Sequence, residues 1–313
     1  MSIAFTFPGQ GSQAVGMGKA LADEFAVARA VYEEVDEALG EKLSDIMWNG
    51  PEDALTLTRN AQPALMAASI AALRVLEEKG LVLAEKVAYV AGHSLGEYSA
   101  LAASGAISLA DTARLLRVRG DAMQKAVPVG EGAMAAVLGL SFDDVQAVAQ
   151  AASEGDVCQV ANDNAPGQVV ISGAKDAIER AIPLAKEKGA KRALLLPVSA
   201  PFHCALMTPA AEAMAEALAA VTINKPAVPL VANVLATPVE DGETIRKHLV
   251  EQVTGMVRWN ESVSWFGDNG IDCLFEIGTG KVLSGLAKRI VKGIATVNVG
   301  EPGDIEAAMG KFA

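Results

Sequence analysis

The 313-residue sequence has few cysteines, few basic residues and no long apolar run. Its three cysteines, Cys158, Cys204 and Cys273, are scattered, which argues against a disulfide framework and against a metal site. Acidic residues outnumber basic ones, 38 to 26, and a net charge of −12 repels phosphate backbones. No segment is apolar for long enough to span a bilayer, and the first residues lack the pattern of a signal peptide. We therefore expect a cytoplasmic protein that binds neither nucleic acid nor membranes.

Hydrophobic residues make up 51% of the chain, and strand-like runs alternate with helix-like ones. This alternation predicts an α/β fold in which helices cover a mainly parallel sheet. Residues 127–199 differ, because their runs follow the order β-α-β-β-α-β that is typical of a ferredoxin-like unit. We predict a large α/β domain formed by residues 1–126 and 200–313, with residues 127–199 inserted as a small domain. A ligand should bind in the cleft between the two.

Two local signals support this division. Ser141, followed three positions later by Asp144, predicts the N-terminus of a helix within the insert. The run "VPLVANV", residues 228–234, predicts a strand of the larger sheet.

The stretch "GHSLG", residues 92–96, places Ser94 in a Gly-x-Ser-x-Gly pattern between a strand-like run and a helix-like one. The glycines permit a tight turn that exposes the serine as a nucleophile. The N–H of Leu95 at the helix start would then stabilise an oxyanion. The alternative is that Ser94 only caps the helix. The position of the pattern between a strand and a helix favours the nucleophile.

A serine nucleophile needs a base, and the chain has three histidines. His93 adjoins the serine in the turn, so its side chain should point elsewhere and pack or form a hydrogen bond. His248 lies in "TIRKHLVEQ" and is predicted to be an exposed helical residue. His203, in "SAPFHCALM", lies between the two predicted domains and is the preferred base. The neighbouring Cys204 suggests a thiol enzyme, but a free cysteine is usually buried as a small hydrophobe.

Two glycine-rich stretches offer alternative sites. Residues 9–14, "GQGSQA", match a dinucleotide-binding pattern, but Pro8 interrupts the end of the strand and no acidic residue ends a second strand. The same loop can instead supply a second oxyanion donor, the N–H of Gln10. Residues 278–285, "GTGKVLSG", resemble a phosphate loop only in the Gly-Lys pair, so a structural turn is the better interpretation.

Arg119 lies on the apolar stripe of a predicted helix, whereas Arg117 falls among polar neighbours. A guanidinium on an inward face needs an anionic partner, because burial of an unpaired charge is costly. That partner is either an internal carboxylate such as Glu97 or the carboxylate of a substrate. The planar guanidinium holds a substrate carboxylate with two hydrogen bonds.

Several motifs together resemble the malonyl-CoA:acyl carrier protein transacylase family. They are "FPGQGSQ", "GHSLGEYSAL", "RGDAM", "GAMAAVLGL", "NAPGQVVISG" and "PVSAPFHCALM", and they are spread over nearly the whole chain. The resemblance implies an α/β-hydrolase-like large domain with a ferredoxin-like insert. It also implies that malonyl-CoA acylates the serine, and that malonyl then passes to the phosphopantetheine thiol of acyl carrier protein for fatty acid chain elongation. No bound cofactor is implied, because the phosphopantetheine belongs to the partner, and we expect a monomer.

The resemblance also assigns roles to residues at matching positions. The family uses a Ser-His dyad, which explains why the sequence shows no obvious acidic third member. A backbone carbonyl orients the histidine instead. By position, Ser94 is the nucleophile, His203 the base, Arg119 the residue that binds the malonyl carboxylate, Gln252 the residue whose carbonyl orients the base, and Asn162 a further substrate-binding residue, while the N–H groups of Gln10 and Leu95 form the oxyanion hole.

The implied carrier protein is acidic, so an enzyme of net charge −12 needs a local basic surface to bind it. Two basic clusters qualify, one within residues 186–192 and one within residues 281–292. A solvated helix face is the alternative reading of both. The residues that we expect to contact the carrier are Lys191, Arg192, Lys288 and Arg289.

The sequence departs from the family at two turn positions, Thr279 and Met256, where proline is usual or common. Neither change removes a chemical group. Three other functions stay open on the residues alone: a serine hydrolase or thioesterase with the same dyad, a dinucleotide-dependent oxidoreductase, and a noncatalytic module that binds a carrier protein.

Overall fold

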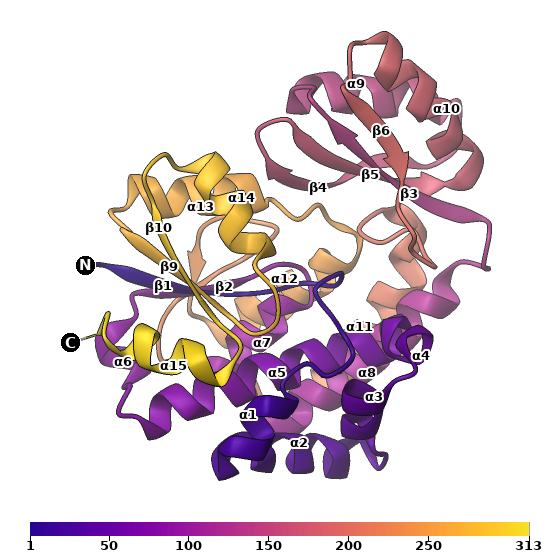
Figure 1. The fold of residues 1–313 in the computed structure, drawn as a ribbon. Helices are drawn as coiled ribbons and strands as arrows, with labels where there is room; N and C mark the ends of the chain where they lie inside the picture. The colour runs from indigo at the N-terminus through magenta and orange to yellow at the C-terminus, as the bar shows by residue number, and fades with distance from the viewer. Residues whose placement is uncertain (313) are drawn as a thin grey trace.

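The computed structural model describes residues 1–312 and contains two separate sheets (Figure 1). The larger sheet has the strand order β10-β9-β1-β2-β7-β8. All neighbours in it are parallel except β7 and β8, which are antiparallel. Its strands are β1 (Ile3–Phe7), β2 (Tyr89–Gly92), β7 (Leu230–Val231), β8 (Pro238–Val239), β9 (Cys273–Ile277) and β10 (Ala295–Val299).

Helices cover both faces of this sheet, which is why β1 is buried along its whole length and is apolar except for Thr6. Phe5 and Phe7 pack into the main core, whereas Ala4 faces a second cluster that includes Trp259 and Phe266. The helices are α1 (Lys19–Glu24), α2 (Ala26–Leu39), α3 (Leu43–Asn49), α4 (Glu52–Thr56), α5 (Thr58–Glu78), α6 (Leu83–Lys86), α7 (Gly96–Ala103), α8 (Leu109–Ala126), α11 (Thr208–Ala219), α12 (Gly242–Thr254), α13 (Trp259–Asp268), α14 (Val282–Ile290) and α15 (Pro302–Met309).

The smaller sheet is antiparallel, with the order β4-β5-β3-β6, and it has a core of its own. Its chain order is β3 (Gly132–Leu138), α9 (Phe142–Ser153), β4 (Cys158–Ala165), β5 (Gln168–Ala174), α10 (Lys175–Glu187) and β6 (Arg192–Leu195). This β-α-β-β-α-β unit lies apart from both chain termini in Figure 1. The predicted α/β fold with a ferredoxin-like insert is thus confirmed, while the exact boundaries at residues 127 and 199 stay a prediction.

The two local signals have different outcomes. The Ser141 hydroxyl accepts a hydrogen bond from the Asp144 N–H at 3.2 Å, so Ser141 caps α9 as predicted. The predicted strand at 228–234 is much shorter, because only Leu230 and Val231 are in β7. Asn233, just beyond, is turned toward the end of β2 by side-chain hydrogen bonds, which replace the ladder there.

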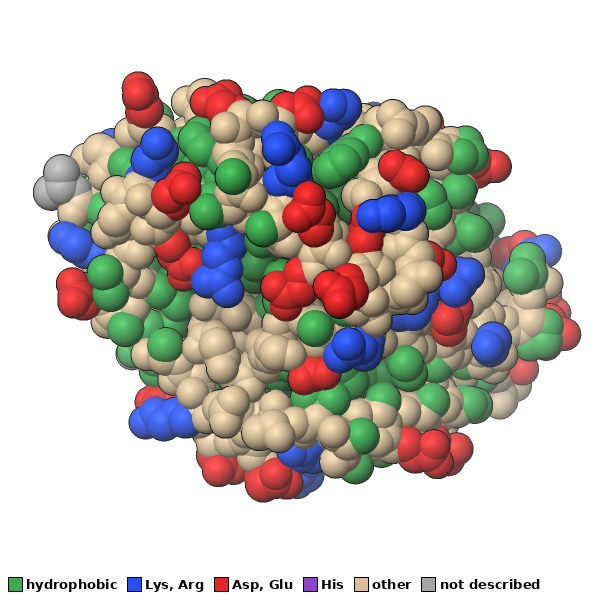
Figure 2. Space-filling model, turned by 90° about the horizontal axis from the view of Figure 1, so that it is seen from below, with side chains coloured by type: hydrophobic (Ala, Val, Ile, Leu, Met, Phe, Trp, Pro, Cys, Tyr) green, Lys and Arg blue, Asp and Glu red, His purple; other side chains and the backbone are tan. Residues whose placement is uncertain are grey.

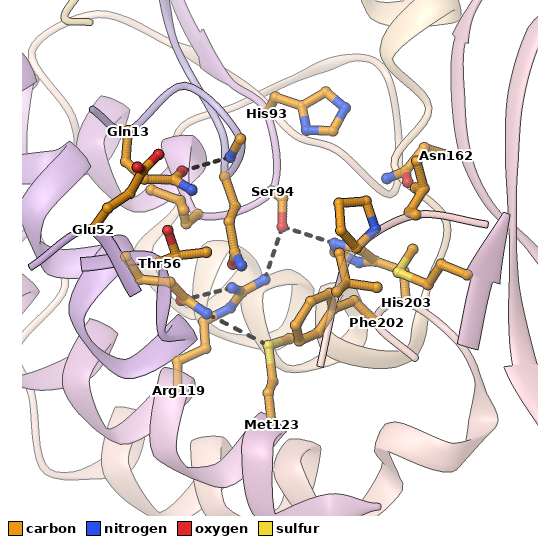
Figure 3. A pocket seen from close by; sticks show the side chains of 18 residues that line it. Gln13, Glu52, Thr56, His93, Ser94, Arg119, Met123, Asn162, Phe202 and His203 are labelled. Atoms are coloured by element: carbon orange, nitrogen blue, oxygen red, sulfur yellow. Dashed lines mark hydrogen bonds between the residues drawn. The ribbon is translucent and has the colours of Figure 1, made fainter. Parts of the chain in front are cut away.

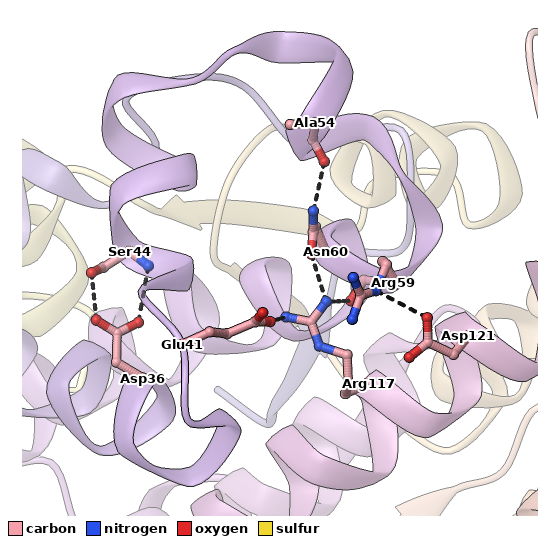
Figure 4. Close-up of polar contacts among 8 residues, drawn as sticks. All are labelled: Asp36, Glu41, Ser44, Ala54, Arg59, Asn60, Arg117 and Asp121. Atoms are coloured by element: carbon pink, nitrogen blue, oxygen red, sulfur yellow. Dashed lines mark hydrogen bonds and ion pairs between the residues drawn. The ribbon is translucent and has the colours of Figure 1, made fainter.

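A proline in α5 determines how α5 and α8 are joined. Pro63 lies inside α5 and has no N–H to donate to the carbonyl four residues earlier, that of Arg59. Arg117 of α8 donates to this carbonyl at 2.8 Å and also to Asn60 and Glu41 (Figure 4). Arg59 in turn pairs with Asp121 at 2.9 Å. These bonds fix the α8 segment that also carries Arg119.

The surface below the sheet carries both signs of charge. Figure 2 shows acidic and basic side chains interspersed with hydrophobic ones over this face, so it presents no extended patch of one sign. Within residues 1–312, no helix is long and apolar enough to cross a membrane.

Candidate active site

Ser94 stands in a strained turn between β2 and α7. Its φ of 54° lies in the left-handed region, which non-glycine residues seldom adopt. The flanking glycines are required by space: a Cβ on Gly92 would lie 1.9 Å from the Gly96 carbonyl carbon, and one on Gly96 would lie 2.2 Å from the Phe7 carbonyl oxygen. The residue at the cap position of α7 is Leu95, so Ser94 does not cap the helix. This geometry is that of a nucleophile elbow.

The Ser94 hydroxyl contacts His203. The distance from Ser94 Oγ to His203 Nε2 is 2.7 Å (Figure 3). His203 Nδ1 lies 2.9 Å from the Gln252 carbonyl oxygen and 3.1 Å from that of Gly255. Carbonyl oxygens only accept hydrogen bonds, so Nδ1 carries the proton and Nε2 is left to accept the proton of the serine. Burial, followed by the Arg119 charge, lowers the pKa of His203 to about 3, which keeps the ring neutral.

Arg119 lies beneath this pair with its side chain 1% exposed. Gly120 makes this position possible, because a Cβ there would lie 2.6 Å from the Arg59 Cα, so α8 packs closely against α5. Nη2 of Arg119 donates to Ser94 Oγ at 3.2 Å and to Gln252 Oε1 at 2.8 Å, and Nη1 donates to Gln62 Oε1 at 2.8 Å.

The anionic partner that Arg119 was expected to need is not in direct contact with it. Within residues 1–312, no carboxylate forms an ion pair with this guanidinium. Glu97 influences it only electrostatically, and burial lowers the pKa of Arg119. The guanidinium therefore faces the serine with neutral polar groups around it, which leaves its charge available to a ligand.

These side chains line a pocket of about 470 Å³ between the two parts of the fold. Gln10 and Leu95 lie in its wall, and within residues 1–312 neither backbone N–H donates a hydrogen bond. Asn162 lies in the wall contributed by β4, 7% exposed. The remaining lining is mostly apolar or neutral and includes Met123, Met134, Leu196, Val198 and Phe202.

Backbone pairing joins the insert to the loop that holds the histidine. Val257 donates to the Ala161 carbonyl at 2.9 Å and accepts from the Asp163 N–H at 3.0 Å. Val257 follows Gly255 closely, so the edge of β4 also supports a carbonyl that accepts from His203. Met256, one of the two turn positions noted in the sequence, lies between Gly255 and the paired Val257.

The other two histidines have different surroundings. His93 points away from the serine, and its Nε2 lies 2.8 Å from Asn164 Oδ1, as expected for a structural residue. His248 was predicted to be exposed, and this is wrong: it is 8% exposed and lies among the buried residues of α12. Cys204 is buried, which raises the pKa of its thiol and disfavours the reactive thiolate.

Neither glycine-rich stretch forms a nucleotide site in this structure. Gln10, Gly11 and Gln13 of the first stretch line the pocket, but the next helix begins only at Lys19. At residues 278–285 the N–H groups of Leu283 and Ser284 donate to the Glu276 carboxylate at 3.0 and 2.8 Å. A phosphate would need these same N–H groups. The stretch is a turn that a buried glutamate caps.

Three polar side chains of the site, those of Asn233, Gln62 and Gln252, have no signal in the sequence. Asn233 accepts from the Ser94 N–H at 2.7 Å and donates to the Gly92 carbonyl at 2.6 Å. Gln62 supports Arg119, and the Gln252 side chain touches three groups of the site in addition to its carbonyl contact. These residues are far apart in sequence, and no motif or hydrophobic pattern around any of them marks it as part of a site.

One of the two basic clusters lies in the insert, and the other lies on α14 of the large domain. Lys191 and Arg192 are exposed where β6 begins. Lys288 and Arg289 are exposed near the end of α14, and Arg289 donates to the Pro166 carbonyl at 3.0 Å and to Gln168 Oε1 at 2.5 Å. Part of the second cluster thus has a structural task in holding the turn between β4 and β5.

Comparison with known proteins agrees with this geometry. Residues 4–298 match the family model described as an acyl transferase domain. The malonyl CoA-acyl carrier protein transacylase of Bacillus subtilis is 47% identical, over 98% of this chain and 96% of its own. The chain belongs to this transacylase family.

Solved structures extend the agreement to three dimensions. The acyl-carrier-protein-S-malonyltransferase of Bartonella henselae is 60% identical and superposes with a TM-score of 0.98, over 100% of this chain and 99% of its own. A malonyl-transacylase solved in complex with its type II PKS acyl-carrier protein is 42% identical, with a TM-score of 0.96 over 99% of this chain and 100% of its own. The transacylase fold is therefore present over the full described chain.

Proposed function

We propose that this protein is a malonyl-CoA:acyl carrier protein S-malonyltransferase that works through an acyl-Ser94 intermediate. The observation that carries the proposal is the guanidinium of Arg119, buried and without a contacting carboxylate in the described chain, 3.2 Å from the hydroxyl that His203 holds. A dyad activates the serine, and the adjacent charge selects an acyl group that ends in a carboxylate.

The first half-reaction acylates the enzyme. Ser94 Oγ attacks the thioester carbon while its proton passes to His203 Nε2. The N–H groups of Gln10 and Leu95 donate to the oxyanion that forms. When the tetrahedral intermediate collapses, the C–S bond breaks, and the CoA thiolate leaves with the proton that His203 returns.

The second half-reaction transfers malonyl to the carrier. The phosphopantetheine thiol gives its proton to His203 and attacks the acyl-serine carbonyl in the same oxyanion site. Collapse returns the proton to Ser94 Oγ. The Gln252 and Gly255 carbonyls keep the ring in the required tautomer throughout both halves. Asn162, which lines the pocket, is the further substrate-binding residue.

The partner is an acyl carrier protein, and the phosphopantetheine is supplied by it, so the enzyme needs no bound cofactor. Support comes from the related malonyl-transacylase that was solved with its own acyl-carrier protein. Lys191, Arg192 and Lys288 form the basic surface that receives an acidic carrier. We place the enzyme in the cytoplasm, where it supplies malonyl groups for fatty acid chain elongation.

Mass spectrometry of the intact protein after incubation with malonyl-CoA tests the mechanism. We expect one malonyl group on Ser94, with CoA released before any carrier is added, as ping-pong kinetics require. Ser94→Ala should take up none, and His203→Ala should be acylated roughly 10² to 10⁴ times more slowly, the usual contribution of a positioned base. A malonyl group on Cys204, or an adduct on Ser94→Ala, would contradict the mechanism. Rapid release of malonate to water with no transfer to carrier would indicate a hydrolase.

A further inference from the structure

Glu97 is a buried carboxylate that the mechanism above does not use. It lies in the first turn of α7, three residues after the nucleophile, and is 1% exposed. Burial is the largest influence on its pKa and raises it to about 7, against the opposing effects of Gln252, Asn233 and Arg119. A carboxylate in such a position destabilises the fold unless its hydrogen bonds compensate.

Both hydrogen bonds to this carboxylate that lie within residues 1–312 reach the same oxygen. Gln252 Nε2 donates to Glu97 Oε2 at 2.6 Å, and the N–H of Asn233 donates to it at 3.3 Å. One atom of Glu97 thus joins α12 to the loop that follows β7. Neither partner is charged.

The first bond fixes the direction of the Gln252 amide. Nε2 also donates to the Ser94 carbonyl at 2.9 Å, so the amide oxygen is turned toward Arg119 and accepts from Nη2 at 2.8 Å. If the amide were reversed, its NH2 group would face the guanidinium, donor against donor. The carboxylate of Glu97 opposes that reversal, because an amide oxygen placed against it would be repelled.

The second bond supports the turn that carries the nucleophile. Asn233, held by Glu97, accepts from the Ser94 N–H at 2.7 Å and donates to the Gly92 carbonyl at 2.6 Å. The strained φ of Ser94 persists because these contacts surround it on both sides. The same carboxylate therefore touches the supports of the nucleophile and of the guanidinium.

We propose that Glu97 is a positioning residue that sets the donor selectivity of the site, because it orients Gln252 and thereby aims Arg119 at the acyl group on Ser94. This inference rests on the proposed transferase function. It predicts that removal of the acceptor affects malonyl more than acetyl, because only malonyl has a carboxylate for the guanidinium to hold.

The experiment compares enzyme acylation by malonyl-CoA with that by acetyl-CoA, as a ratio of single-turnover rates. Glu97→Met removes the acceptor at similar volume and should lower the malonyl-to-acetyl ratio by about tenfold, the scale of one hydrogen bond to a charged group. Glu97→Gln keeps an oxygen that can accept both bonds and should restore most of the ratio. Glu276→Gln is the matched control, since Glu276 is buried and accepts backbone N–H groups, but at α14. It should leave the ratio unchanged.

A folded Glu97→Met variant with the wild-type ratio would overturn the proposal, and so would a Glu97→Gln variant that falls as far as Glu97→Met. If Glu97→Met does not fold, Glu97→Asp takes its place. Its shorter side chain withdraws the acceptor from Gln252, so the ratio should again fall, and an unchanged ratio would refute the inference. Failure of the wild type to take up malonyl would instead contradict the proposed function. The result for the wild type therefore distinguishes a failure of the proposed function from a failure of the inference about Glu97.

Discussion

Replacement of Arg119 by alanine is the sharpest test of donor selectivity. In the free enzyme the guanidinium is fully buried, and its hydrogen bonds go to the neutral oxygens of Gln62, Gln252 and Ser94. A malonyl group on Ser94 would bring a carboxylate to this charge and form two charge-assisted hydrogen bonds. An acetyl group has no carboxylate and would leave the Arg119 charge without an anionic partner. Removal of the side chain should therefore weaken malonyl transfer and spare acetyl transfer.

The magnitude follows from the burial of the pair. Loss of one partner of a buried ion pair costs about 3–5 kcal/mol. At about 1.4 kcal/mol for each factor of ten, this corresponds to a rate of malonyl acylation lower by about 10² to 10⁴. Arg119→Lys should recover only part of this loss, because a single ammonium cannot reproduce the planar arrangement of donors that Nη1 and Nη2 provide.

The assay measures acylation of Ser94 by each donor in a single turnover, for wild type and both variants, with thermal unfolding as the control for folding. The ratio of the malonyl rate to the acetyl rate is the quantity to compare, since misfolding would lower both rates together. If folded Arg119→Ala keeps the wild-type ratio, the guanidinium serves only to hold Gln62 and Gln252 in place. The selectivity would then have to come from another part of the pocket.

Two further outcomes follow from the charges of the site and its surroundings. Because burial and the Arg119 charge lower the pKa of His203 to about 3, the base stays neutral as the pH falls, and in Glu97→Gln, which lacks the carboxyl group whose pKa burial raises to about 7, the rate of acylation should hold from a pH of about 8 to about 5; loss of half the rate of that variant near pH 6.5 would show an ordinary histidine. The double variant Lys191→Glu, Arg192→Glu should raise the KM for the carrier and leave acylation by malonyl-CoA unchanged, and added salt should weaken the wild-type reaction with carrier. Equal loss in both half-reactions of the double variant would point to a folding defect.

Much of the fold is predictable because its signals are local. The alternation of strands and helices, the β-α-β-β-α-β order and the cap at Ser141 each depend on neighbouring residues, and all three are present in the structure. The prediction for His248 failed for a complementary reason. Basic neighbours at 246 and 247 suggested an exposed position, but the histidine lies on the buried face of α12 with Ile245 and Leu249, and only the tertiary packing determines which face is buried.

Some residues of the candidate site likewise have local signals in the sequence, and others do not. Ser94 can be predicted from the glycines that a tight turn requires, and Arg119 from its position as a cation on the apolar stripe of a helix. Each signal lies within a single short segment of the sequence. The structure brings these two side chains and His203 together. Asn233 and the side chain of Gln252 have no such mark. Their contacts join residues more than 130 positions apart, and an asparagine or glutamine in a helix or loop is commonplace.

The arrangement around His203 also explains why carbonyl groups, and not a carboxylate, orient the ring. Nδ1 is held by two carbonyl oxygens, and Nε2 lies on the hydroxyl that Arg119 also touches. A carboxylate on Nδ1 would place a negative charge close to the guanidinium and reduce its attraction for an incoming acyl carboxylate. Carbonyl dipoles fix the tautomer without that cost. The carboxyl group that the site does contain, that of Glu97, is joined to Arg119 by hydrogen bonds only through the Gln252 amide, so it can direct the guanidinium without forming an ion pair with it. The Arg119 guanidinium can therefore hold the substrate carboxylate beside Ser94 while His203 stays neutral.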